Sequence, residues 1–278
     1  MKILAIGDFH GTFSDKLKKR IISENPDLIV GVGDYTGIAD WRVFLKTVFK
    51  CYKEGKEAPS GEGFFGKKGF KRLLKKDFEA GKRVLNGLKE IGKQFIFVFG
   101  TGDDVWYKYP FGKYEVNKKA LRFVKKLGAK NITYGISKFD GINFVGFGGY
   151  MDVPANYDEK EGDNYKRAMK RVNASRKKLF ANARRAVGEK IFVFHYPPYG
   201  VFDKIQGKKN PYHGGSAGIP AFREAILKFK PKIALCGHMH EYQGMKKIGK
   251  TLVVNPGDAE RGRFAVIDYP EMKVRFFK

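Results

Sequence analysis

The sequence predicts an α/β protein, and three observations lead to this prediction. Four near-continuous apolar runs are typical of strands buried on both faces, at residues 3–6, 28–32, 191–194 and 233–236. Segments with helical periodicity separate these runs, and each run is followed, directly or after one glycine, by aspartate or histidine. In an open α/β sheet the carboxyl ends of the strands form the ligand crevice, so we expect these polar side chains to meet at one edge.

The elements of the first third follow in chain order. A crossover helix is predicted at residues 14–24, after the first strand. The region at about 41–93 is too long for a simple crossover, and we interpret it as a basic helical insertion. Within it we expect a helix at 42–52, a Gly/Pro-rich loop at 55–69 and a basic helix with an apolar stripe at 70–91.

The remaining elements continue the same alternation, and we treat residues 1–278 as a single domain. Further strands are predicted at 95–99, 132–134 and 142–147, and further helices at 115–127, 164–187 and 219–229. The helix at about 164–187 carries lysine and arginine from Lys166 to Arg185 without one acid. It is either a solvated helix face or a surface for a phosphate backbone, and repulsion between neighbouring cations weighs against the first interpretation.

Six side chains at the strand ends are candidate metal ligands: Asp8, His10, Asp34, His195, His238 and His240. Of the five histidines in the chain, only His213 lies outside these stretches. Aspartate and histidine with little cysteine are the ligands of hydrolytic divalent metals. The two oxygens of Asp34 could bridge two cations about 3.5–4 Å apart, which together hold a phosphate and convert a bridging water to hydroxide.

At these residues the chain resembles the calcineurin-like metallophosphoesterases. The matching motifs are Asp8-Phe9-His10, Gly33-Asp34, Gly100-Thr101-Gly102-Asp103, His195 and Gly237-His238-Met239-His240. The resemblance implies a two-sheet β-sandwich core flanked by helices on both outer faces. It also implies two metal sites: one formed by Asp8, His10, Asp34 and His240, the other by Asp34, His195, His238 and an asparagine of the third motif.

The third motif departs from the family pattern. Thr101 stands where the family has its metal-binding asparagine, and Gly102 stands where it has a catalytic histidine. A hydroxyl is a weaker ligand than an amide carbonyl, so we expect a weak second metal site with Thr101 as its ligand. Asp103 or Asp104 could replace the ligand, although Asp103 matches a position that is structural in the family.

Several residues are candidates for work on the substrate. Asp34 is a catalytic candidate as the bridging carboxylate, and Thr101, Asp103 and Tyr196 are candidates for substrate binding. His213 could donate a proton or bind a phosphate oxygen, and the alternative is an ordinary surface histidine.

We therefore expect a metal-dependent phosphoesterase that attacks phosphorus with a metal-bridging hydroxide. Loss of the acid-donating histidine argues against alkyl monoesters and favours a phosphodiester or an aryl ester. Two divalent ions are expected, Mn²⁺ first, although iron, cobalt, nickel and zinc accept the same ligands. The alternative is a binding or scaffold protein on a degenerate metallophosphoesterase fold.

The net charge of +26 comes from 55 Lys and Arg against 29 Asp and Glu. Such an excess attracts phosphorylated substrates and nucleic acid, so the basic helices are candidate nucleic-acid surfaces. No apolar run approaches the roughly 20 residues that cross a bilayer, so no membrane partner is expected. Cys51 and Cys236 show no disulfide spacing, which favours a cytoplasmic protein. The sequence leaves the oligomeric state open.

Overall fold

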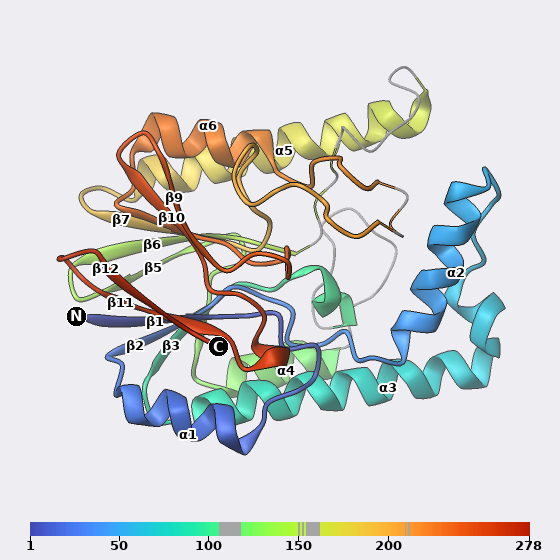
Figure 1. Ribbon diagram of the computed structural model, residues 1–278, viewed down its shortest axis with the longest axis horizontal. Coiled ribbons are helices and arrows are strands. Elements are labelled where there is room, and N and C mark those ends of the chain that lie inside the picture. Colours follow the sequence, from blue (N-terminus) through green and yellow to red (C-terminus); the bar gives the residue numbers. More distant parts are fainter. Residues whose placement is uncertain (106–117, 150, 152, 154–161, 209, 211) are drawn as a thin grey trace.

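Two six-stranded sheets form the centre of the molecule (Figure 1). The structure, a computed structural model, describes residues 1–105, 118–149, 151, 153, 162–208, 210 and 212–278. The first sheet has the order β12 (Lys273–Phe277), β11 (Phe264–Asp268), β1 (Lys2–Ile6), β2 (Leu28–Gly31), β3 (Gln94–Phe97), β4 (Lys130–Asn131). The second has the order β5 (Ile136–Phe139), β6 (Ile142–Phe147), β7 (Lys190–Phe194), β8 (Ile233–Leu235), β10 (Thr251–Asn255), β9 (Gly244–Ile248).

Parallel pairing in the middle of each sheet gives both sheets a common functional edge. Strands β1, β2, β3 and β4 are parallel, as are β6, β7, β8 and β10. The antiparallel partners β11, β12, β5 and β9 close the outer positions. The predicted α/β class with a two-sheet sandwich core is confirmed.

Helices cover the outer face of each sheet, as expected. α1 (Asp15–Glu24), α3 (Gly61–Lys89) and α4 (Lys118–Lys126) lie on the side of the first sheet, and α5 (Asp163–Arg185) and α6 (Pro220–Phe229) on the side of the second (Figure 1). Short 3₁₀ helices follow β3 at Thr101–Val105 and β10 at Ala259–Arg261. Within the described ranges, no helix combines the length and apolarity that crossing a membrane requires.

Apolar side chains fill three layers. Aliphatic residues such as Ile3, Val30, Val193 and Leu235 are fully buried between the two sheets. The outer layers contain more aromatic rings than the layer between the sheets. Under α5 and α6, for example, Phe194 stacks on Phe222 with their centroids 4.0 Å apart. Each fully buried side chain of this kind contributes roughly 1.5–3 kcal/mol, which holds the strand ends in fixed positions.

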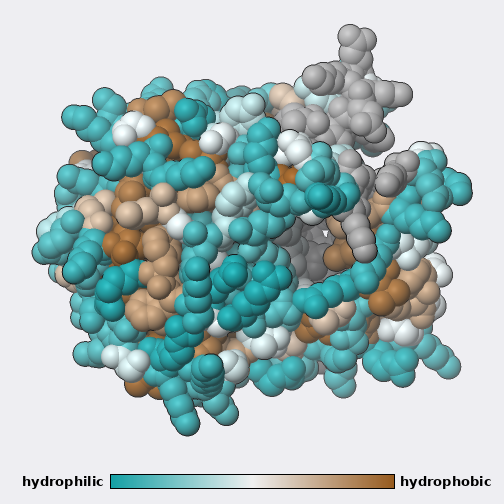
Figure 2. Space-filling view, in the orientation of Figure 1, coloured by the Kyte–Doolittle hydropathy of each residue, from teal (hydrophilic) through white to brown (hydrophobic). Residues whose placement is uncertain are grey.

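The region at about 41–93 contains a helical hairpin of α2 (Trp41–Lys53) and α3. The predicted loop at 55–69 is wrong beyond residue 60, because Ser60 caps the Gly63 amide and α3 begins at Gly61. Its first turns are interrupted only at Gly66 (φ 69°). Ring contacts hold this glycine-rich part in place, for example Trp41 with Phe65 at 6.0 Å. Val43 and Leu45 remain exposed on α2, and Figure 2 shows the hairpin's apolar surface in brown.

One other prediction is wrong, and one can be followed only in part. The strand expected at 132–134 is a turn, because the Asn131 side chain accepts hydrogen bonds from the amide and hydroxyl of Thr133. Pairing with β3 therefore stops at Asn131, and β5 begins only at Ile136. The helix expected at 115–127 is present from Lys118, and residues 115–117 lie outside the described residues.

Candidate metal centre

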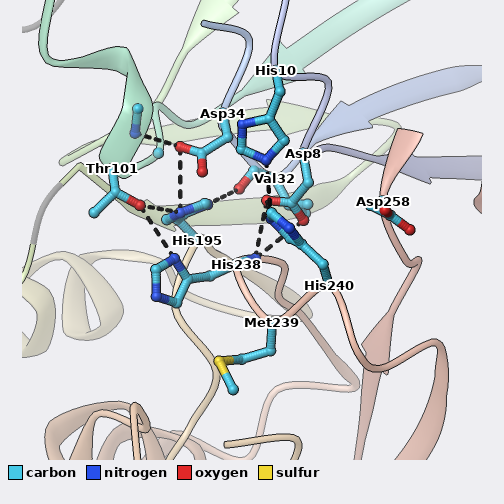
Figure 3. A network of polar contacts seen from close by, with 12 residues as sticks. Asp8, His10, Val32, Asp34, Thr101, His195, His238, Met239, His240 and Asp258 are labelled. Atoms are coloured by element: carbon cyan, nitrogen blue, oxygen red, sulfur yellow. Dashed lines mark hydrogen bonds and ion pairs between the residues drawn. The ribbon is translucent and has the colours of Figure 1, made fainter. Parts of the chain in front are cut away.

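The six predicted ligands meet at the edge where β1, β2, β7 and β8 end (Figure 3). They form two clusters that share Asp34, and within each cluster one ligand atom per residue lies within 4.8 Å of the others. The first cluster comprises Asp8, His10, Asp34 and His240, and the second comprises Asp34, His195 and His238. These groupings are the ligand sets that the family resemblance implied.

The turns that carry the ligands adopt left-handed backbone conformations. Asp8 (φ 56°), His10 (φ 46°), Asp34 (φ 56°) and His238 (φ 67°) all have positive φ. Such conformations cost free energy for residues other than glycine and persist only where the surroundings enforce them. Close packing contributes, since a Cβ at Gly100 would lie 2.2 Å from Asp34 Oδ1. Gly100 is therefore required for the backbone of the third motif to pass beside the shared carboxylate.

Asp103 supplies much of this enforcement. Its side chain is fully buried, and its two oxygens accept hydrogen bonds from the amides of Asp34 (2.8 Å), Tyr35 (2.8 Å), Thr36 (2.9 Å) and Gly100 (2.7 Å). The carboxylate thus holds the Asp34 turn against the third motif. Because both oxygens are occupied by backbone amides, the structure supports neither a metal-ligand role nor the predicted substrate-binding role for Asp103. The side chain of Asp104 lies outside the described part of the chain.

The first cluster is held by charge. His10 Nε2 and His240 Nε2 lie 3.0 Å apart, and His240 Nε2 lies 3.6 Å from Asp8 Oδ1. Burial alone raises the pKa of Asp8, but the neighbouring histidines, His240 foremost, lower it to about 2. Burial alone lowers the pKa of His240, but the contact with Asp8 and the attraction of Asp34 and Asp258 raise it to about 9.

This geometry fits a cation in the first cluster. Two nitrogen ligands about 2.1 Å from one cation are themselves about 3–3.4 Å apart, which matches the separation of the two Nε2 atoms. Without a metal, His240 holds a proton at pH 7, and a divalent cation would replace that proton so that both converging imidazoles could direct a lone pair to it. The donor set of two carboxylates and two imidazoles suits a divalent transition metal.

The second cluster is more deeply buried and holds one carboxylate. His195 Nδ1 lies 2.9 Å from the carbonyl oxygen of Val32, which can only accept a hydrogen bond. Nδ1 therefore carries the proton, and the lone pair of Nε2 faces the cluster, 3.5 Å from Asp34 Oδ1. Burial and the neighbouring His195 lower the pKa of His238 to about 3, so its imidazole is neutral at pH 7. The His238 ring is thus prepared as a neutral ligand, and the Nε2 atom of His195 is aimed into the cluster.

Thr101 lies among these ligands. Its Oγ1 is 2.9 Å from His195 Nε2 and 3.2 Å from His238 Nδ1. The hydroxyl therefore occupies the place where the resemblance put an asparagine ligand (Figure 3). Gly102 contributes only backbone groups: its amide donates to Asp34 Oδ1 at 2.7 Å, and its carbonyl accepts from the Thr36 hydroxyl.

Tyr196 and His213 have different surroundings. Tyr196 is buried, and its ring packs on the ring of His238 with centroids 4.2 Å apart, so it orients a cluster residue. His213 is exposed on the loop between Lys204 and Ser216 and belongs to neither cluster. The structure therefore brings together all predicted metal ligands and Thr101, but it leaves His213 outside this group.

Two contributors were missed by the sequence analysis. The Val32 carbonyl is backbone and leaves no signal in the sequence. Asp77 of α3 is 1% exposed and accepts from the amides of Gly37 (2.8 Å) and Ile38 (3.0 Å) and from Trp41 Nε1 (2.8 Å). It ties the segment after Asp34 to the hairpin. The sequence did carry a signal for Asp77. It lies four residues after Leu73 and three before Ala80, so it falls on the buried face of the helix, where an acid needs a partner.

Known proteins share part of this sequence and its fold. The chain is 35% identical over 134 residues to the uncharacterized protein MJ1162 of Methanocaldococcus jannaschii, a match that covers 45% of this chain and about half (53%) of that protein. The crystal structure of TT1561 of Thermus thermophilus has a TM-score of 0.60 at 18% identity and covers 100% of this chain and 98% of that one. Phosphopantetheinyl hydrolase PptH from Mycobacterium tuberculosis has a TM-score of 0.53 at 10% identity, with 99% and 95% covered.

These structural similarities show the fold alone. The family model described as "Metallophosphoesterase, calcineurin superfamily" matches residues 1–278, the whole chain. The chain therefore belongs to the metallophosphoesterase family of the calcineurin superfamily.

Proposed function

We propose that this protein is a metal-dependent phosphodiesterase. The observation that carries the proposal is the pair of ligand clusters joined at Asp34, with Thr101 and Gly102 in place of the usual asparagine and histidine. Family and clusters together indicate a dinuclear metal site. We propose Mn²⁺ as the natural ion, and iron, cobalt, nickel and zinc also accept this ligand set.

The metals and the chain contribute different things. When bound, two divalent cations would polarise the phosphoryl oxygens and lower the pKa of water at the site. Asp34 would belong to both sites, with its Oδ1 oriented by the Gly102 amide. The Val32 carbonyl fixes the His195 tautomer, and Tyr196 holds the ring of His238. These contacts preorganise the ligands, so little rearrangement is needed when substrate arrives.

The substitution at Gly102 determines the substrate class. A positioned general acid contributes roughly 10²–10⁴-fold when a poor leaving group must be protonated. Glycine supplies no such acid at this position. Esters with a stable leaving group, such as the aryl diester, therefore lose least, whereas an alkyl leaving oxygen, including the sugar oxygen of a nucleic acid, would have to take its proton from water at the site. A phosphodiester is the class that we propose.

The test is hydrolysis of three substrates with Mn²⁺. We expect bis-p-nitrophenyl phosphate and p-nitrophenyl phosphate to be cleaved, and glycerol 2-phosphate, an alkyl monoester, to be cleaved at least about 100-fold more slowly. His238→Ala should abolish the activity, with its thermal unfolding measured in parallel to show that it folds. Comparable turnover of glycerol 2-phosphate and the aryl diester would contradict the leaving-group argument.

A second candidate function is supported by the same two residues. Thr101 and Gly102 replace a ligand and an acid, which favours a binding or scaffold protein on this fold. Against it, all six other ligands are present and converge. Metal bound without hydrolysis of any of the three esters would select this alternative.

A further inference from the structure

Residues 165–177 of α5 line a shallow groove of about 610 Å³. Three lysines face it, Lys166, Lys170 and Lys177, together with Tyr165, Met169 and Asn173. The lysines recur at intervals of four and seven residues, so they lie along one side of the helix. The groove is therefore a cationic strip with an aromatic residue and an amide beside it.

These three lysines differ from other cations of α5. Arg176 pairs with Glu224, and Lys178 Nζ lies 4.8 Å from the ring centroid of Tyr134. Lys166, Lys170 and Lys177 are exposed and form no ion pair with any residue in the described part of the chain. Neighbouring like charges on a helix destabilise it, so the arrangement is unfavourable unless an anion is bound.

The position of the groove relates it to the metal centre. β1 runs toward the edge that carries the metal ligands, and α5 begins at that same end of the molecule, as does the hairpin of α2 and α3 (Figure 1). A polymer bound along the groove would therefore reach the end of the molecule toward which the ligand-bearing strands run. A small phosphorylated metabolite would not span the row of lysines, which extends over about 16 Å for eleven residues of helix.

We propose that this groove binds single-stranded nucleic acid and directs its phosphodiester backbone toward the metal centre. Backbone-binding grooves for single strands combine a row of cations with aromatic side chains, the combination present here. An anionic membrane would instead favour a continuous apolar face beside the cations, which Met169 and Ala174 do not provide. The net charge of +26 and a pI near 9.9 fit the same partner.

Binding can be tested without catalysis, by fluorescence anisotropy in EDTA. The probe is a fluorescein-labelled oligodeoxythymidylate about 20 nucleotides long, titrated at salt concentrations of roughly 50 to 200 mM. The groove variant is Lys166→Gln, Lys170→Gln, Lys177→Gln. The matched control is Lys247→Gln, Lys250→Gln, Lys273→Gln, which removes the same charge from exposed positions on β9, the following turn and β12.

We expect the groove variant to bind at least about tenfold more weakly at low salt. Its salt dependence, as the slope of log K against log salt, should shrink by about 2, because each single-strand phosphate contact contributes about 0.7. The control variant should stay within about twofold of the natural protein. Equal weakening of both variants, or no affinity for the oligonucleotide, would overturn the proposal. So would binding to phosphatidylglycerol vesicles that the groove variant loses while its oligonucleotide affinity is unchanged.

The delivery of the strand to the metals rests on the proposed phosphodiesterase function, whereas the binding does not. With Mn²⁺, the groove variant should cleave bis-p-nitrophenyl phosphate at the natural rate and an oligonucleotide at least about tenfold more slowly at low salt. If the natural protein cleaves no diester, the proposed function fails while the binding result stands. If both variants cleave the oligonucleotide equally well, the groove does not deliver it.

Discussion

The two ligand clusters share one carboxylate but differ in charge and burial. The first contains Asp8 and Asp34, so a divalent cation there meets two negative charges, and His240 is partly open to solvent. The second contains Asp34 as its one carboxylate, beside the fully buried His195 and the hydroxyl of Thr101. Since a buried cation needs nearby negative charge, the first cluster should bind metal tightly and the second weakly. We thus expect the weaker site in the half where the third motif departs from the family pattern.

The largest effect is expected from the residue that the clusters share. Asp34→Asn removes a negative charge that both sites share, so the metal content of both sites should fall. The rate of hydrolysis should fall by about 100-fold or more. Replacing a residue that only hydrogen-bonds to a metal ligand typically costs about 10–100-fold. Metal analysis after gel filtration and the aryl diester assay measure the two quantities. Asp40→Asn is the matched control, because Asp40 is exposed and pairs with Lys76. Loss of metal from only one site would show that Asp34 does not bridge the clusters.

A smaller effect on hydrolysis, but a measurable loss of stability, is expected from Asp103, which accepts a hydrogen bond from the Asp34 amide. Asp103→Asn leaves one acceptor oxygen for four amide donors, and its amide would face two of them. We expect unfolding free energy to fall by about 3 kcal/mol, measured from urea denaturation. Asp77→Asn provides the comparison, because only the hydrogen bond from Trp41 Nε1 is lost, at a cost of about 1–2 kcal/mol. Equal losses in the two variants would contradict the special role of Asp103.

The smallest effect is expected away from both clusters. His213→Ala should change the rate of diester hydrolysis by less than about twofold, because exposed substitutions outside a site have small effects. The pH dependence of the rate should also remain unchanged. A fall of about 100-fold would instead identify His213 as the proton donor considered from the sequence.

Much of the site could be predicted from the sequence because it depends on strand ends. Carboxyl ends of parallel strands meet at one edge, so Asp8, Asp34, His195 and His238 could be placed together without a structure. The contribution of the Val32 carbonyl could not, because the backbone is the same at every position. The pairing of Arg176 with Glu224, 48 residues apart in the chain, was equally hidden, so the free lysines of α5 could not be told from the paired cations.

Errors in the fold have similarly local causes. The glycines at 61, 63, 66 and 69 predict a loop, but ring contacts of Trp41, Phe44, Phe64 and Phe65 stabilise a helix there. The apolar Ile132 predicts a strand, but Asn131 forms a turn and leaves Ile132 buried beside it. In both places a tertiary or side-chain contact outweighs the intrinsic preference of the segment.

The most direct test of the unequal sites is a calorimetric titration of the metal-free protein with Mn²⁺, beside Thr101→Asn. Two binding events with distinct affinities are expected for the natural protein. The asparagine carbonyl should strengthen the weaker event by about tenfold and leave the stronger one unchanged, since the Thr101 hydroxyl contacts His195 and His238 of the second cluster. A single event, or a change confined to the stronger one, would contradict the assignment of the weak site to the second cluster.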